Sequence, residues 1–202
     1  MIMSFYLENL REVLRLSPIL IVGLPLFFSG IEENPEWLYF SAGAFLSEKV
    51  NHHTKKLIYK YFYNFPQIYR PQGAIQCGVA IQPNATKPWT NLGMPSGHSQ
   101  IVGFFSGYFI YRIINKKENR KLSLKQIVKK EKTKLITLIV IVFLGMIARL
   151  NISVAGFISA DKYGCHTLEQ VVVGGSLGLV YGMLWNRFYP EIKNIFSNKC
   201  SR

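Results

Sequence analysis

The chain has 202 residues, of which 49% are apolar, 14% aromatic and 17% charged, and its formal net charge is +13. This composition excludes an intrinsically disordered chain, because disorder requires low hydrophobicity together with high net charge, and three cysteines are too few for a disulfide scaffold. A mean hydropathy of +0.15 leaves two classes, a basic soluble protein and a membrane protein with basic loops.

The basic residues are concentrated in connecting segments. Residues 116–134 contain nine Lys or Arg and two Glu, whereas 18–31, 135–148 and 171–186 contain no charged residue. A nucleic-acid-binding domain distributes its basic residues over one face of a helix or sheet, so this pattern argues against a nucleic-acid partner. Charge that is confined to loops between apolar segments is typical of a polytopic membrane protein, whose partner is the bilayer.

The predicted elements are all helical. Residues 1–16 are predicted to form an N-terminal interfacial helix, and residues 191–202 a basic cytoplasmic tail. Between them, 17–190 form one transmembrane domain with about five membrane-spanning helices, predicted at residues 17–31, 36–62, 97–114, 133–150 and 166–186. The fold class is therefore an all-α, polytopic membrane helix bundle.

The loop charges predict the orientation of the bundle. The 115–134 loop carries a net charge of +7 and is expected to be cytoplasmic, which places the 63–97 and 151–165 loops together on the lumenal side. The glycosylation sequons at Asn84 and Asn151 fall in these loops, and so do Cys77 and Cys165, which can form a disulfide in an oxidising compartment. We expect an integral protein of the endoplasmic reticulum or another endomembrane.

Histidines and arginines punctuate the lumenal ends of the predicted helices. Ser96 is a good N-cap and Gly97 lets an anion approach the backbone amides, so this helix N-terminus is suited to bind phosphate. Arginines add forked donors that match phosphate oxygens, while one histidine can attack the phosphate and another can protonate the leaving oxygen. The candidate residues are Arg70, His98, Arg149 and His166.

Residues four apart suggest that the third and fifth helices pack closely. Small residues at this spacing mark helix-packing faces in membranes, so both histidines are expected to point into the bundle. One stripe contains His166, Gln170, Gly174, Gly178 and Gly182, and the other contains Ser99, Gly103 and Gly107.

The motifs resemble those of the type 2 phosphatidic acid phosphatase / vanadium haloperoxidase superfamily, integral-membrane branch, over residues 36–186. That family has Lys-x6-Arg-Pro, Pro-Ser-Gly-His and Ser-Arg-x5-His-x3-Asp motifs. The second is intact at 95–98. The phrases Gly-Met-Pro-Ser-Gly-His-Ser-Gln at 93–100 and His-Thr-Leu-Glu-Gln-Val at 166–171 further resemble dolichyl-diphosphatases.

Two motifs depart from the family pattern. Arg70-Pro71 is present, but Lys60, the nearest upstream lysine, is separated from Arg70 by nine residues instead of six. In the third motif Ala precedes Arg149, sixteen residues separate Arg149 from His166 instead of five, and Gln170 replaces the acid. Gln170, a backbone carbonyl or Glu169 remains open as the group that orients His166.

The resemblance implies a lipid phosphatase that needs neither metal nor cofactor and hydrolyses an isoprenoid diphosphate or phosphatidate. His166 would be the nucleophile that forms a phosphohistidine, and His98 the general acid. Arg149 would stabilise the phosphoryl group, which Arg70, Ser96, Gly97 and Lys60 would bind. The alternative is a catalytically inactive relative that binds lipid phosphate or acts as a membrane scaffold. The oligomeric state is not predicted.

Overall fold

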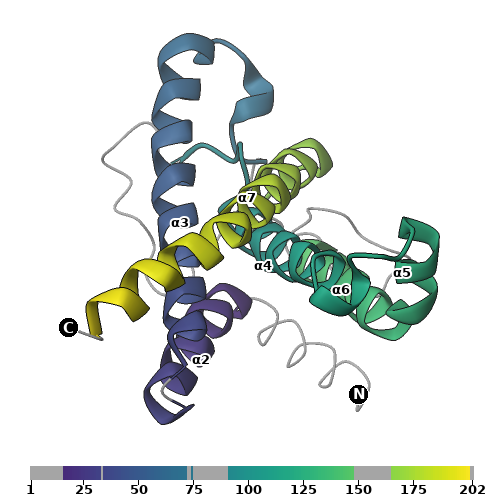
Figure 1. Ribbon diagram of the computed structural model, residues 1–202. Coiled ribbons are helices and arrows are strands. Elements are labelled where there is room, and N and C mark those ends of the chain that lie inside the picture. Colours follow the sequence, from purple (N-terminus) through teal and green to yellow (C-terminus); the bar gives the residue numbers. More distant parts are fainter. Residues whose placement is uncertain (1–15, 33, 72–73, 75–90, 148–164, 201–202) are drawn as a thin grey trace, which may run out of the picture.

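The computed structural model describes residues 16–32, 34–71, 74, 91–147 and 165–200, and over these residues the protein is all-helical with no strand. A 3-10 turn follows α3, another precedes α5, and Tyr69 and Leu92 form an isolated β-bridge. The α-helices are α2 (Ser17–Glu32), α3 (Pro35–Phe62), α4 (Gly97–Ile114), α5 (Leu124–Lys130), α6 (Lys132–Ile147) and α7 (Leu168–Cys200). Figure 1 shows α7 crossing α3, with α5 at the far end of α4 and α6.

The five long helices lie where five apolar segments were predicted, but their capacity to cross a membrane is a separate question. Over the described residues, one segment, Leu168–Asn194 of α7, is long and apolar enough to span a bilayer; α2 is apolar but shorter. The all-helical prediction is therefore confirmed, and the five-span bundle stays a prediction. The predicted boundary at residue 190 falls inside α7, which continues to Cys200, and the interfacial helix predicted for residues 1–16 lies almost wholly outside the described residues.

Side chains before the helices fix where three of them begin. Asn34 caps α3, since its side chain accepts a hydrogen bond from the Glu36 amide at 3.0 Å. Ser96 caps α4 in the same way through the Ser99 amide at 3.4 Å. Thr167 accepts from the Gln170 amide at 3.4 Å at the start of α7. These caps satisfy amides that have no partner within the helix. The Ser96 and Thr167 caps fix the two helix ends at which His98 and His166 lie.

The closest helix–helix packing joins α4 and α7, and glycines make it possible. A Cβ atom at Gly178 would collide with the Gln100 carbonyl, and one at Gly107 would collide with the Leu179 carbonyl. The same holds for Gly174 against Ser96, Gly182 against Phe104 and Gly103 against Gly175. The contact positions advance in the same direction along both helices, so α4 and α7 run parallel. The predicted glycine stripes are therefore confirmed as one packing interface.

Helix α3 packs against α4 and α7, and an aromatic contact joins it to α7. Tyr39 stacks on Trp185 with ring centroids 4.8 Å apart, and each donates a hydrogen bond to the other's backbone carbonyl. The Trp185 indole lies where a side chain at Gly43 would be. Beside this contact, α3 and α4 share a core of fully buried Phe40, Ala44, Phe104 and Tyr108.

The two ends of the bundle differ in character. The start of α3 and the end of α4 meet through an ion pair of 2.7 Å between Glu36 and Arg112, and Tyr108 donates to the same carboxylate at 3.3 Å. The basic 115–134 segment continues from this end of α4. Near the other end of these helices lie the described parts of 63–97 and residues 165–166. The predicted separation of these loops from the basic segment therefore holds for their described parts.

We expect Glu36→Gln to lower the thermal unfolding midpoint by a few degrees. The change removes a charge-assisted hydrogen bond that stabilises the fold by about 1–2 kcal/mol. This is a low value for such a bond, because the Arg112 side chain is 40% exposed and solvent screens the charge. Glu118→Gln is the matched control, since Glu118 is 75% exposed and lies 3.5 Å from Lys130. An equal shift in both variants would contradict this assignment.

Candidate active site

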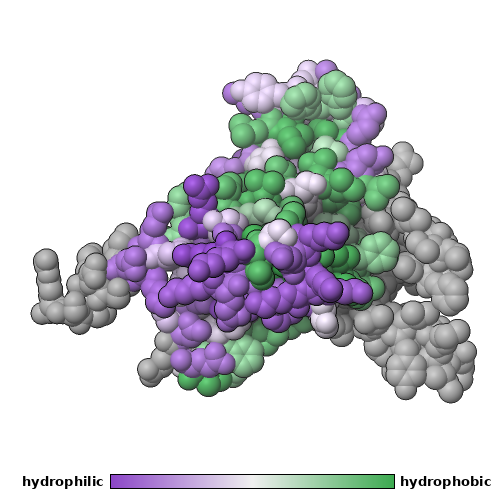
Figure 2. Space-filling model, turned by 45° about the vertical axis from the view of Figure 1, so that its right-hand side comes forward, coloured by the Kyte–Doolittle hydropathy of each residue, from purple (hydrophilic) through white to green (hydrophobic). Residues whose placement is uncertain are grey.

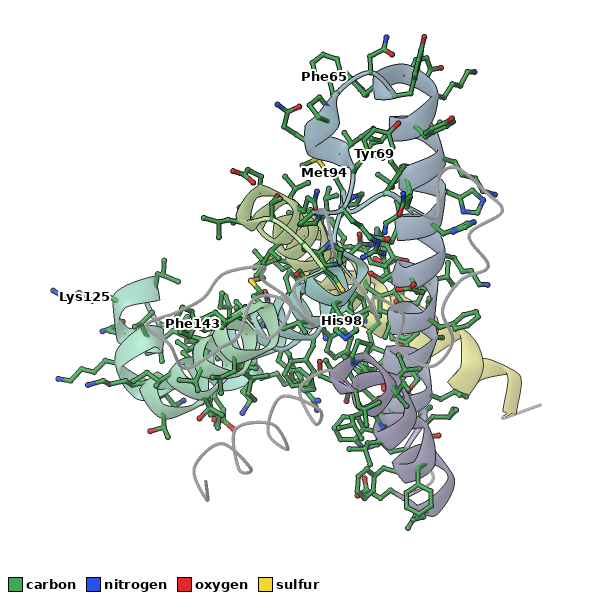
Figure 3. All side chains as sticks on the ribbon, turned by 180° about the vertical axis from the view of Figure 1, so that it is seen from behind. Phe65, Tyr69, Met94, His98, Lys125 and Phe143 are labelled. Atoms are coloured by element: carbon green, nitrogen blue, oxygen red, sulfur yellow. The ribbon has the colours of Figure 1, made fainter. Side chains whose placement is uncertain are left out.

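Three segments that are distant in sequence meet at the N-terminal ends of α4 and α7. The amides of Gly93 and Met94 donate to the Ile68 carbonyl at 2.8 and 3.1 Å, and the Arg70 amide donates to the Asn91 carbonyl at 3.2 Å. The loop after α3 is thereby joined to the loop before α4. Figure 3 shows Tyr69 and Met94 near each other, with His98 deeper in the molecule where the helices meet.

Gln170 connects these two loops to α7. Its side-chain amide donates to the carbonyls of Gln67 and Tyr69 at 2.9 and 2.7 Å. Its backbone carbonyl accepts from the Ser96 amide at 3.0 Å. Gln170 is fully buried, and its amide group occupies the space that a Cβ at Gly93 would need. One side chain therefore contacts all three segments of the site.

These contacts also determine the protonation of His166. The Gln170 NH₂ group faces two carbonyl acceptors, so its Oε1 atom is the acceptor that lies 3.3 Å from His166 Nδ1. His166 Nδ1 then carries a proton, and in the neutral form of the ring the lone pair is on Nε2. His166 is 2% exposed, so this tautomer is held in a buried position.

The Pro-Ser-Gly-His segment is positioned from two sides. On the α7 side, Gly174 packs directly against the Ser96 backbone. On the α3 side, Asn51 donates to the Pro95 carbonyl at 3.3 Å and to Gln100 Oε1 at 2.8 Å. Ser96 is fully buried and His98 is 6% exposed. The start of α4, which carries the positive end of the helix dipole, is thus held beside Gln170.

Arg70 brings a cation to the residue that precedes His166. Its Nη1 atom donates to the Cys165 carbonyl at 3.4 Å. Burial lowers the pKa of Arg70 to about 10, so the guanidinium remains protonated at neutral pH. It retains further N–H donors that can bind phosphate oxygens.

A second basic side chain comes from α3, and it is Lys55. Its Nζ atom donates to the Leu92 carbonyl at 3.0 Å, and it interacts electrostatically with Arg70 and Glu48. Lys60, the lysine chosen from the sequence, is exposed, and its Nζ atom lies 5.2 Å from the centroid of the Tyr61 ring. The structure therefore favours Lys55 as the lysine of the first motif, and the role of Lys60 stays a prediction.

Sequence reasoning missed Lys55 and Asn51, although a signal for both exists. Ala44, Ser47, Asn51 and Lys55 are spaced three or four residues apart and form one face of α3. Lys60 lies five residues beyond Lys55 and so falls on another face. Helical periodicity, applied to the polar residues of this apolar segment, would have selected Lys55.

Two further predictions concern residues outside the described part of the chain. Arg149 lies there, so its approach to His166 stays a prediction. Cys165 is disulfide-bonded, but Cys77, its predicted partner, also lies outside the described residues. Within the described ranges, no group of three or more His, Cys, Asp or Glu side chains is arranged to hold a metal ion.

A family model described as the PAP2 superfamily matches residues 38–193, well over half of the chain. The chain belongs to the PAP2 superfamily. No curated protein and no solved structure matches it. Membership in PAP2 supports a phosphatase-type activity, and together with the apolar α7 it supports association with a membrane. The matched region contains every described residue of the site.

We expect Lys55→Gln to lower kcat/KM for phosphate release roughly tenfold or more, because one charge-assisted contact to phosphate is lost. Lys60→Gln is the matched control and should change kcat/KM less than about twofold, as expected for an exposed charge. A larger loss of kcat/KM in Lys60→Gln than in Lys55→Gln would show that Lys60 is the lysine of the first motif.

Proposed function

We propose that this PAP2 protein is an integral-membrane phosphatase that hydrolyses a phosphomonoester or diphosphate of a lipid through a phosphohistidine at His166. The observation that carries the proposal is the Gln170 contact to His166. It fixes a proton on Nδ1, so that Nε2 is the nucleophilic atom of the neutral ring, within the same cluster that contains Arg70 and the N-terminus of α4. A nucleophile, a cation and the positive end of a helix dipole in one place are groups that favour phosphoryl transfer.

In the first step, the His166 Nε2 lone pair attacks phosphorus as the bond from phosphorus to the leaving oxygen breaks. His98 donates its proton to that oxygen. In the second step, a water oxygen attacks the phosphohistidine, His98 takes a proton from the water, and the N–P bond breaks to restore His166. Gln170 keeps Nδ1 protonated throughout and accepts its hydrogen bond when the ring becomes positively charged.

The phosphoryl oxygens require positive charge during both steps. Arg70, Lys55 and the Gly97 amide are proposed to supply it, together with Arg149, which lies outside the described residues. The Ser96 amide, which the sequence also predicted as a phosphate donor, instead donates to the Gln170 carbonyl at 3.0 Å. Arg70 and Lys55 are held by contacts that exist without substrate. The chemistry then needs no metal ion, and we expect a chelator to leave the rate unchanged.

The outer surfaces of the helices favour a lipid environment and a lipid substrate. Large apolar side chains lie exposed along α2, α3, α6 and α7 while the interior contains glycines and polar groups, an arrangement suited to a bilayer. Examples are Phe27 on α2 (63% exposed), Ile139 and Phe143 on α6 (64% and 61%), and Val180 on α7 (54%). We propose that the five long helices span the membrane, with the basic 115–134 segment cytoplasmic and the site on the lumenal side of an endomembrane.

The decisive experiment measures phosphate release by the purified full-length chain in detergent. The panel contains an isoprenyl diphosphate, phosphatidate and a soluble aryl phosphate, each with and without a chelator. Release from a lipid substrate that the chelator leaves unchanged supports the proposal. Activity that is lost with the chelator and restored by a divalent metal would contradict the metal-independent mechanism, and preference for the soluble phosphate would contradict a lipid substrate.

A catalytically inactive, lipid-phosphate-binding relative is the second candidate. The sixteen residues between Arg149 and His166 and the glutamine at position 170 favour it, because both depart from the family motif. No release from any member of the panel, combined with retained binding of a phosphate analogue, would favour this second function. The dolichyl-diphosphatase-like phrases favour an isoprenyl diphosphate within the panel.

A further inference from the structure

The basic segment between α4 and α6 is folded, whereas the sequence predicted only a loop there. Residues 115–131, here called the basic cap, contain a 3-10 turn and α5. Ser123 and Gln126 form a reciprocal capping box at the start of α5. Buried Asn119 donates to the Ile113 carbonyl at 2.7 Å, and buried Ile127 packs with Ile113 and Leu138. The cap therefore holds its lysines in a defined arrangement.

Both acidic residues of the cap form ion pairs, one with a lysine of the cap and one with a lysine just after it. Glu118 pairs with Lys130 at 3.5 Å, and Glu131 pairs with Lys134 at 2.6 Å. Lys121, Lys125 and Lys129 are exposed, and none of the ion pairs in the described residues involves them. Figure 3 shows Lys125 extending away from the helices. These three lysines present uncompensated positive charge.

An apolar pair accompanies these lysines. Leu124 and Val128 are 65% and 48% exposed and lie one turn apart on α5. Together with buried Ile127 they form one apolar arc, of which one part packs on the bundle and the other is uncovered. Figure 2 shows a broad hydrophilic surface around a small hydrophobic area on the side of the molecule that it brings forward.

We propose that the basic cap binds an anionic lipid surface. Leu124 and Val128 insert at the boundary between headgroups and acyl chains, and Lys121, Lys125 and Lys129 contact the headgroup phosphates. This combination of a small apolar face and flanking lysines is the chemistry of interfacial helices on anionic bilayers. The cap follows the end of α4 opposite the candidate active site, so this lipid site is distinct from substrate binding.

The test uses the full-length chain reconstituted in phosphatidylcholine vesicles. Energy transfer from its tryptophans to a dansyl-labelled phosphatidylglycerol or a dansyl-labelled phosphatidylcholine measures the preference for the anionic lipid. We expect a clear preference for phosphatidylglycerol that weakens at high salt, because added ions screen exposed charges. Each lysine near the surface contributes roughly fivefold, so Lys121→Gln/Lys125→Gln/Lys129→Gln should remove most of the preference.

Two further variants make the outcome specific to the cap. Lys49→Gln/Arg187→Gln/Lys193→Gln removes the same charge from exposed positions elsewhere and should keep most of the preference. Leu124→Gln/Val128→Gln keeps every charge and should weaken the preference by removing the inserted side chains. Equal association of the unchanged chain with both lipids would overturn the proposal, as would equal losses in the two charge variants. A cap that selects an acidic protein or nucleic acid would show no lipid preference.

Discussion

His166→Ala is expected to lower the rate of phosphate release roughly 10³-fold or more, the largest effect of any single change in this chain. The substitution removes the only group proposed to form the covalent intermediate, and the remaining cations and amides can bind phosphate but cannot attack it. Initial rates on the best lipid substrate measure the loss. Labelling with a substrate that carries radioactive phosphate should give an alkali-stable, acid-labile phosphoprotein in the unchanged chain and none in the variant.

Two other histidine variants test whether the loss of activity is specific to His166. His53→Ala should be nearly neutral, because His53 is exposed and its ring contacts the Lys49 carbonyl and the neighbouring His52 ring, neither of which belongs to the candidate site. His98→Ala should slow a lipid alkyl substrate strongly but an aryl phosphate less, since a good leaving group needs less protonation. A phosphoprotein that persists in His166→Ala would assign the nucleophile to another residue.

Periodicity predicted the helices and their closest interface because both depend on local spacing. Gly174, Gly178 and Gly182 of α7 recur every four residues, and the structure packs them against the backbone of α4 and its N-cap. The Pro-Ser-Gly-His segment was predicted at a helix start because Ser96 is a capping residue, and Ser96 does cap α4. Gln170, four residues after His166, was one of three groups proposed to orient that histidine, and its side chain does contact the ring.

The remaining features depend on tertiary contacts that spacing along one helix does not encode. Lys60 was selected as the lysine nearest upstream of Arg70, with the turn at Pro66 allowed for, but a count of residues does not show which lysine of α3 the folded chain places beside Arg70. The carbonyls of Gln67 and Tyr69 carry no sequence signal, so the double anchoring of Gln170 was not predictable. A high density of lysine suggested a loop at 115–134, although a capping box within it marks a helix.

Gln170 is expected to be the second most sensitive position, and two substitutions test which of its contacts matter. Gln170→Met keeps the volume but removes all side-chain hydrogen bonds, which leaves two carbonyls without their amide donors and frees the His166 ring. Phosphate release should fall roughly 10²-fold or more, and the free energy of unfolding should fall by about 2–4 kcal/mol. Initial rates and thermal unfolding of the same preparations measure the two losses.

Gln170→Glu gives the contrasting case, because it supplies an acid where the family motif has one. A carboxylate can accept the His166 Nδ1 proton at least as well as the amide does, but it would face the Gln67 and Tyr69 carbonyls with negative charge and no donors. We therefore expect Gln170→Glu to destabilise the protein at neutral pH at least as much as Gln170→Met. If Gln170→Glu is instead as stable as the unchanged chain and faster, orientation of His166 is the whole role of this position. In that case the two loop carbonyls have other donors, and the joining of the three segments does not depend on Gln170.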